Sequence, residues 1–213
     1  MPVTQTPAPR SEDEAREILA AELDGLSERA DALGEAGAQA VAAWSLQMAY
    51  EFEAAQMAWA RTVELEPHNA QARFNEGVCL LEVESLEAAE QAFRHALEID
   101  AAVTEGEPGE GLDWFEEDPH FKLGNVQHLR GDLEAACVHY ARSAQRNLTA
   151  VEALTELIRC RLALGQAEKA LEAIDRLTTR AARLSVRAEA EAYRAEARAL
   201  LSAAAESESE AGS

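Results

Sequence analysis

Apolar residues recur along most of this chain at steps of three and four positions, the spacing that places side chains on one face of a helix. No long stretch alternates apolar and polar residues at a period of two, so we expect no β-sheet. The first apolar stripe lies within residues 11–33 and consists of Ile18, Leu19, Leu23, Leu26, Ala30 and Leu33. The pattern therefore predicts an all-α protein in which residues 11–33 form an N-terminal helix.

A short motif occurs four times in this helical pattern. It is a glutamate followed two residues later by an alanine, and these alanines are Ala55, Ala89, Ala136 and Ala170. Ala55 and Ala89 are separated by about 34 residues, as are Ala136 and Ala170, whereas the separation between Ala89 and Ala136 is longer by about 13 residues. Four residues after each alanine comes a bulky side chain, and twelve residues before three of them comes a small one: Trp59, Phe93, Tyr140 and Ile174, against Ala43, Gly77 and Gly124. Small opposite large at fixed spacing is how paired helices interlock, so we predict an array of helix pairs with one insertion.

The second unit has the most complete set of signature residues, namely Gly77, Leu80, Ala89, Phe93 and Ala96, and Pro67 closes the unit before it. At these residues the chain resembles the tetratricopeptide repeat (TPR) proteins, which stack helix pairs of about 34 residues. The resemblance covers residues 34–177. It implies a right-handed superhelix of antiparallel helix pairs, here with an extra N-terminal helix and a C-terminal capping helix, and a concave groove that binds peptides.

The register divides the chain into segments. We expect repeats at residues 36–69, 70–100, 117–150 and 151–177, with the insertion at residues 101–116. Asp118 followed by Pro119 predicts a helix start, because Asp caps helices and Pro is favoured in the first turn. A last helix at residues 178–205 would cap the stack with a polar outer face. Residues 1–10 and 206–213 are expected to be disordered tails.

The acidic charge is concentrated in the first half of the chain. The net charge is −21, and residues 1–121 contain 6 Arg and no Lys against 27 Asp or Glu, whereas residues 122–213 contain 13 basic and 13 acidic residues. Such a surface repels a phosphate backbone, so we expect no nucleic-acid binding, and it favours a basic partner. No segment has the roughly 18 to 20 apolar residues of a membrane span, and residues 1–10 lack the apolar run of a secretory signal. We therefore expect a cytoplasmic protein that binds no membrane.

No catalytic, cofactor or metal site is expected. The five histidines include no pair four residues apart, and the one pair eight residues apart, His120 and His128, has no carboxylate at ligand spacing. No serine stands in a nucleophile elbow. Cys79, Cys137 and Cys160 lack CxxC spacing, which favours small buried hydrophobic roles for them. The sequence predicts a protein that is not an enzyme.

The insertion joins an acidic, glycine-rich stretch to an apolar motif made of Leu112, Trp114 and Phe115. Two roles remain open for this motif. It either packs on the junction of the second and third repeats, or it forms a flap that docks into the groove or onto a partner.

The candidate binding residues lie on the first helix of each repeat, on the face that the resembled fold turns towards its groove. They are Trp44, Gln47, Met48, Gln71, Phe74, Asn75, Val78, Phe121, Lys122, Asn125, His128, Thr155 and Arg159, together with Glu82 and Glu156. This mixed aromatic, polar and cationic lining suits an extended or helical peptide with apolar anchors.

We therefore predict an adaptor or scaffold that binds a segment of a protein partner. Three alternatives remain open. The chain could be a cytoplasmic chaperone similar to those of type III secretion translocators, a self-assembling scaffold, or an acidic decoy of nucleic acid. The oligomeric state is not determined by the sequence.

Overall fold

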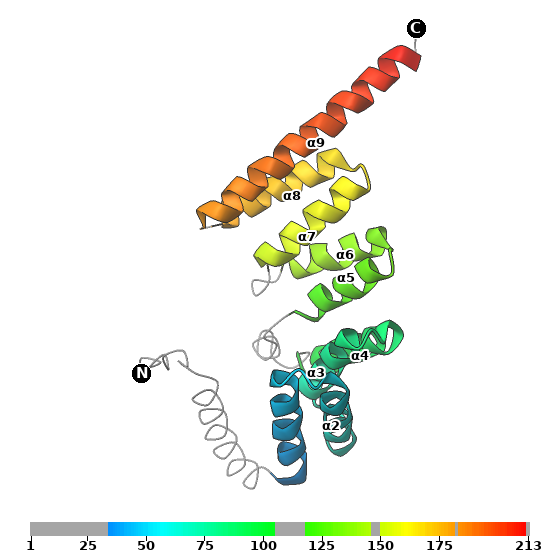
Figure 1. Cartoon of the computed structure of the whole chain (residues 1–213), viewed down its shortest axis with the longest axis vertical. Helices are drawn as coiled ribbons and strands as arrows, with labels where there is room; N and C mark the ends of the chain where they lie inside the picture. Colours follow the sequence, from blue (N-terminus) through cyan, green and yellow to red (C-terminus); the bar gives the residue numbers. More distant parts are fainter. Residues whose placement is uncertain (1–33, 105–117, 146–149, 182, 212–213) are drawn as a thin grey trace.

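The computed structural model describes residues 34–104, 118–145, 150–181 and 183–211, and these residues form a stack of helices with no β-strand among them (Figure 1). After helical residues 34–48 come α2 (Phe52–Leu65), α3 (Ala70–Glu82), α4 (Leu86–Thr104), α5 (Pro119–Leu129), α6 (Leu133–Ser143), α7 (Ala150–Ala163), α8 (Ala167–Arg180) and α9 (Leu184–Ala211). Each helix from α2 to α9 packs on the next one along the chain. The prediction of an all-α fold is confirmed.

The turn inside each helix pair contains one residue with left-handed backbone geometry. These residues are Tyr50, Glu84, Gly131 and Gly165, with φ values of 62°, 58°, 81° and 68°. Each lies five positions before an alanine of the sequence motif, so the turns follow the same intervals as the motif. Glycine adopts this conformation without steric cost, so the third and fourth turns are relaxed, whereas Tyr50 and Glu84 are strained.

The paired helices interlock where the sequence places small residues opposite large ones. A Cβ added to Gly77 would lie 2.8 Å from the ring of Phe93, and one added to Gly124 would lie 2.5 Å from the ring of Tyr140. Both rings are buried. Glycine is therefore required for the close approach of α3 to α4 and of α5 to α6.

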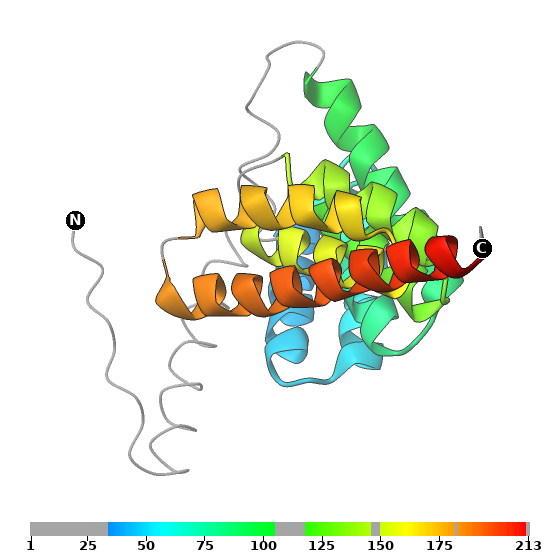
Figure 2. The ribbon, with the colours of Figure 1, turned by 90° about the horizontal axis from the view of Figure 1, so that it is seen from above.

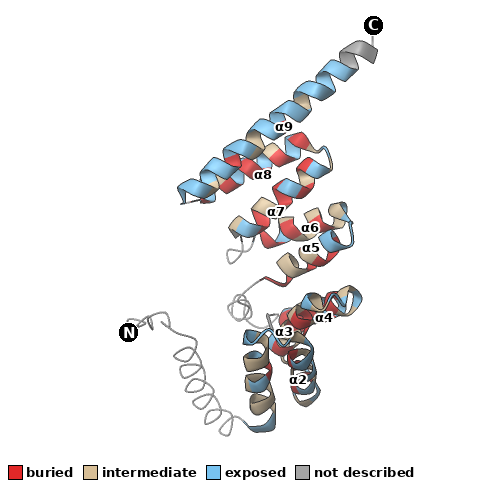
Figure 3. Cartoon of the chain, viewed as in Figure 1, coloured by how far each residue is buried: buried red, intermediate tan, exposed pale blue. Residues whose placement is uncertain are grey.

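Among the described residues, buried side chains form three apolar clusters. Figure 3 shows in red the buried residues along the stack. One contains Trp59 and Cys79, the next contains Phe93 and Leu123, and the largest contains Tyr140 and spans α6 to α9. Because each cluster draws residues from neighbouring helix pairs, adjacent units are held together mainly by apolar packing.

The first helix of the third unit, α5, begins at Pro119 and is capped by Asp118, as the sequence predicts. The side chain of Asp118 accepts a hydrogen bond of 2.7 Å from the backbone N–H of His120, and Pro119 occupies the first turn of α5. Asp118 is buried. The first turn of α5 is thereby capped by Asp118.

The C-terminal helices end later than expected. We expected a break near residue 178, but α8 continues to Arg180, whose Nη1 donates a hydrogen bond of 2.9 Å to the carbonyl oxygen of Ala144. We also expected a disordered tail from residue 206, but α9 continues to Ala211, so this expectation is wrong as far as that residue. The segment is rich in Ala and Glu, which favour helices. With 28 residues against 14 in α8, α9 extends beyond its neighbour (Figures 1 and 2).

Several predicted segments lie outside the described residues. These are the tail at 1–10, the helix at 11–33 and most of the insertion, including Leu112, Trp114 and Phe115. Both roles proposed for that apolar motif therefore remain predictions.

Candidate protein-binding cleft

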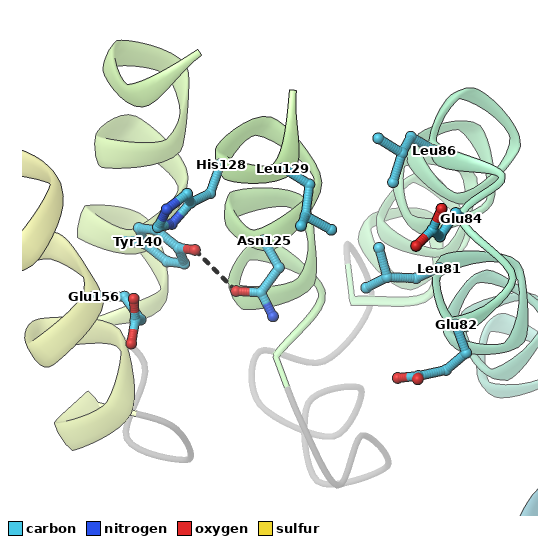
Figure 4. Close-up of a pocket in the computed structure, with 9 residues that line it drawn as sticks. All are labelled: Leu81, Glu82, Glu84, Leu86, Asn125, His128, Leu129, Tyr140 and Glu156. Carbon is cyan, nitrogen blue, oxygen red and sulfur yellow. Dashed lines mark hydrogen bonds between the residues drawn. The ribbon is translucent and has the colours of Figure 1, made fainter. Parts of the chain in front are cut away.

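A cleft of about 670 Å³ opens where the second unit meets the third (Figure 4). Its lining comes from the turn between α3 and α4, from the second half of α5, and from one residue each of α6 and α7. The lining residues are Leu81, Glu82, Glu84, Leu86, Asn125, His128, Leu129, Tyr140 and Glu156. Helix α5 lies in the middle of this surface, with α3 and α4 on one side and α6 and α7 on the other.

The position of α5 results from its packing on α4. Leu123 and Val126 join the apolar cluster of Phe93, and Gln127 Nε2 donates a hydrogen bond of 2.8 Å to Glu90 Oε1. Arg130 also pairs with Glu90, which is buried. These contacts hold one side of α5 firmly, and the opposite side is left to line the cleft.

Three leucines form the apolar wall. Leu81 and Leu86 flank the turn of the second unit, and Leu129 faces them from the end of α5 (Figure 4). Leu129 is 63% exposed. Exposed apolar surface in a concave site is a common feature of protein-binding surfaces.

Three carboxylates accompany the leucines. Glu156 pairs with Arg159 at 3.1 Å, whereas Glu82 and Glu84 have no ion-pair partner among the described residues. No Lys or Arg belongs to the described lining of the cleft. The site therefore combines an apolar wall with net negative charge.

A buried tyrosine orients the polar centre of the cleft. Tyr140 donates a hydrogen bond of 2.9 Å to Asn125 Oδ1, and burial raises the pKa of this phenol well above its usual value of 10. Because the carboxamide oxygen is held by Tyr140, the NH₂ group of Asn125 faces the cleft as a donor (Figure 4). This geometry suits recognition of a backbone carbonyl of a bound segment.

No family model and no curated protein sequence matches this chain. Solved structures match its fold. PilF of Pseudomonas aeruginosa superposes with a TM-score of 0.59 at 17% identity, over 88% of this chain and 89% of that one. YrrB, described as a TPR protein with an unusual peptide-binding site, superposes with a TM-score of 0.56 at 19% identity, over 86% and 89% of the two chains. MamA superposes with a TM-score of 0.53 at 16% identity, over 76% and 95%. This chain has the TPR fold.

The predicted groove residues are divided between two pockets. Asn125 and His128 lie in the cleft, as does Glu156. A second pocket of about 250 Å³ brings Trp44, Gln71 and Asn75 together between the first two repeats. These are two separate hollows rather than one continuous line of free side chains.

Phe74 is the clearest error among the predicted groove residues. Only 4% of its surface is exposed, and its ring centroid lies 5.5 Å from that of Phe93. Phe74 precedes Gly77 by three residues, so both lie on the face of α3 that packs against α4. Val78 packs partly against the same cluster. Phe74 is therefore a core residue and does not line the groove.

Other predicted residues are partly committed to internal contacts. Gln47 Oε1 accepts a hydrogen bond of 3.1 Å from the indole of Trp59, and Thr155 Oγ1 donates one of 3.0 Å to its own helix. Phe121 packs on Tyr140 with ring centroids 5.8 Å apart. Met48 is exposed, and Lys122 is half-buried.

Arg159 connects the fourth repeat to α9. Its Nε donates a hydrogen bond of 3.0 Å to the hydroxyl of Tyr193, which in turn donates one of 2.6 Å to Glu189. The side chain also pairs with Glu156. Arg159 is still exposed, but its guanidinium is bonded to Tyr193 of α9 and to Glu156. It therefore contributes less positive charge to the groove than expected.

Five residues that line the cleft are not among the predicted binding residues, namely Leu81, Glu84, Leu86, Leu129 and Tyr140. Four of them lie in or beside turns, where the repeat signature assigns no binding role. A usable signal was present, because Leu129 is a large apolar residue immediately before the Arg130-Gly131 turn. Tyr140 was recognised only as the bulky residue of the interlock.

The structure also brings together two histidines that the sequence keeps apart. The rings of His120 and His139 stack with centroids 5.5 Å apart, and their Nδ1 atoms are separated by 3.3 Å. Burial, followed by the nearby His120, lowers the pKa of His139 to about 4. No cluster of three or more potential metal ligands occurs in the described part of the chain. Among those same residues, no helix has the length and apolar character required to cross a membrane.

Proposed function

We propose that this chain is a non-enzymatic adaptor that binds a protein segment in its groove, and that the cleft between the second and third repeats receives an apolar side chain next to a Lys or Arg. The observation that carries this proposal is the pairing of a leucine wall, exposed at Leu129, with the carboxylates of Glu82 and Glu84, which no described cation neutralises. A basic partner also agrees with the net charge of −21.

The expected energies are modest. Covering the exposed part of Leu129 contributes about 1 kcal/mol, and each ion pair to Glu82 or Glu84 contributes about 0.5 kcal/mol at a solvent-exposed rim. A hydrogen bond from Asn125 adds about 1 kcal/mol. Together with backbone contacts along the groove, these energies suit a segment that binds in the micromolar range rather than a permanent subunit.

The test is selection of a random peptide library displayed on phage against the immobilised full chain. We expect enriched peptides to carry Lys or Arg close to Leu, Ile or Phe. The affinity of a synthetic copy is then measured for three variants: Glu82→Gln/Glu84→Gln, Leu129→Ser, and the control Glu53→Gln/Glu98→Gln, which removes the same charge from exposed positions outside the cleft.

We expect the Glu82→Gln/Glu84→Gln pair to weaken binding about fivefold, as two rim ion pairs imply, and the control pair to leave it within about twofold. Leu129→Ser should weaken it by a similar factor. Enriched peptides that lack Lys and Arg, or that bind the cleft variants unchanged, would show that the segment binds elsewhere. If the library yields no binder, the proposal that the groove binds a protein segment is wrong.

Three alternatives are separated by simple measurements. An acidic decoy would form complexes that weaken steeply between about 150 and 500 mM salt, whereas a complex anchored by leucines would not. A self-assembling scaffold would sediment at a mass that rises with concentration. A chaperone would prevent aggregation of an apolar segment that is insoluble alone.

A further inference from the structure

Two of the three cysteines meet where the third repeat packs on the fourth. Cys137 lies on α6 and Cys160 on α7, and Cys137 packs against the apolar cluster that contains Cys160 where these two helices meet. The second half of α6, residues 144–149 and most of α7 separate them in the sequence, so the pair forms no short sequence motif. Cys79 lies in a different cluster, next to Trp59, and is buried.

The two thiols differ in access. Cys137 is half-buried and lines a pocket of about 320 Å³, separate from the cleft, together with Arg161 and Lys169. Cys160 is 1% exposed. A small oxidant can therefore reach Cys137 directly, whereas Cys160 is shielded from solvent.

The surroundings favour the thiolate of Cys137. The hydrogen bond from Cys160 lowers the pKa of Cys137, and the charges of Arg161 and Lys169 lower it further against the effect of burial. The same contact and burial raise the pKa of Cys160. By contrast, burial raises the pKa of Cys79 to about 12, so Cys79 stays an unreactive thiol.

A base lies within reach of the buried thiol. The Nδ1 atom of His128 is 3.9 Å from the Sγ atom of Cys160. In the tautomer with an unprotonated Nδ1, His128 can accept the proton of Cys160. The pair thus has an accessible nucleophile, a buried second thiol and a proton acceptor, which are the parts needed for disulfide formation.

We propose that Cys137 and Cys160 form a peroxide-reactive dithiol that closes to a disulfide between the third and fourth repeats. The Cys137 thiolate attacks one oxygen of a hydroperoxide, the O–O bond breaks, and Cys137 becomes a sulfenic acid while the other oxygen leaves as an alcohol or water. Cys160 gives its proton to His128 and attacks the sulfur of Cys137, and the departing hydroxide takes up a proton to become water. With hydrogen peroxide, two thiols and one peroxide give one disulfide and two waters.

The disulfide would affect the cleft through His128. His128 lines the cleft and also contacts Cys160. When Cys160 moves towards Cys137, His128 loses this contact. Closure to the ~2.05 Å of a disulfide requires rotation of both side chains and an approach of α6 and α7, which already pack against each other. The proposal does not depend on the identity of any protein partner.

The test uses the reduced full chain treated with hydrogen peroxide at neutral pH. Intact-mass spectrometry should show the loss of two hydrogens, and peptide mapping without reductant should show Cys137 linked to Cys160. Cys79→Ser should react as the wild type does. Cys137→Ser should give no disulfide, and Cys160→Ser should leave a sulfenic acid on Cys137 that dimedone captures.

His128→Gln provides a further check on the proton transfer, because it should slow disulfide closure several-fold without slowing the loss of peroxide. Circular dichroism of each variant shows that it remains folded. A disulfide that involves Cys79, a mixture of intermolecular disulfides, or a wild-type protein that keeps three thiols after peroxide treatment would overturn the proposal.

Discussion

Replacement of Gly124 by alanine tests whether the interlock of small and large residues holds the helix pairs together. The added Cβ would lie 2.5 Å from Cδ1 and Cε1 of Tyr140, about 1 Å inside normal contact between carbon atoms. Tyr140 has little freedom to move, since it is fully buried and its hydroxyl is bonded to Asn125. The helices α5 and α6 must therefore separate.

The magnitude follows from two opposing effects. Overpacking of this kind costs about 1–3 kcal/mol, and the short distance and the fixed ring place Gly124→Ala near the upper value. Alanine favours a helix over glycine by about 1 kcal/mol. We expect a net loss of about 2 kcal/mol, which lowers the urea midpoint by about 1 M for a chain of this size.

The assay is urea unfolding followed by circular dichroism, with Gly77→Ala and Tyr140→Leu as companions. Gly77→Ala should cost less, because its Cβ would lie 2.8 Å from the ring of Phe93. In a Tyr140→Leu background, Gly124→Ala should be neutral or stabilising, because the ring that it meets is gone. A Gly124→Ala protein that is more stable than the wild type by the full helix-propensity gain would refute the interlock.

Two further predictions concern the strained turn and the half-buried His139. Glu84→Gly should raise the free energy of unfolding by about 0.5–1 kcal/mol, because glycine relieves the strain at a φ of 58°. Gly131→Ala, at a φ of 81°, should lower the free energy of unfolding by about 1 kcal/mol. Equal effects of both changes in urea unfolding would contradict this. The folded-state pKa of His139 is about 4 against an ordinary value of 6.5, so the unfolded chain binds the proton first, and this contribution to stability is full above pH 6.5 and lost as the pH falls towards 4. After allowance for partial exposure the loss is about 1 kcal/mol, and it should disappear in His139→Gln; an unchanged pH dependence in that variant would assign the loss to other groups.

Part of the fold could be predicted because it depends on residues that are close in sequence. The contacts of Gly77 with Phe93 and of Gly124 with Tyr140 each join the two helices of one pair across a short turn, and both have the same sequence separation. The left-handed turn residues follow the intervals of the sequence motif. Helix periodicity and the repeat interval therefore carried enough information for the TPR fold.

The binding residues were harder to predict for a reason visible at Phe74. The register placed it on the groove side of α3, but the rotation of α3 about its axis turns it towards Phe93. A rotation of a few tens of degrees moves a side chain between the core and the surface of a helix. The signature positions constrain that angle only loosely.

The sequence alone determined that this protein is an acidic, all-helical array of paired helices with one interruption, because helix periodicity and the interlock within each pair are local properties of the chain. Only the tertiary structure decided which residues of different repeats meet. The cleft around Leu129 and the pair of Cys137 and Cys160 each join elements of separate helix pairs. Their distances depend on how each helix is rotated and stacked against the next, and the apolar packing of the whole array sets those angles.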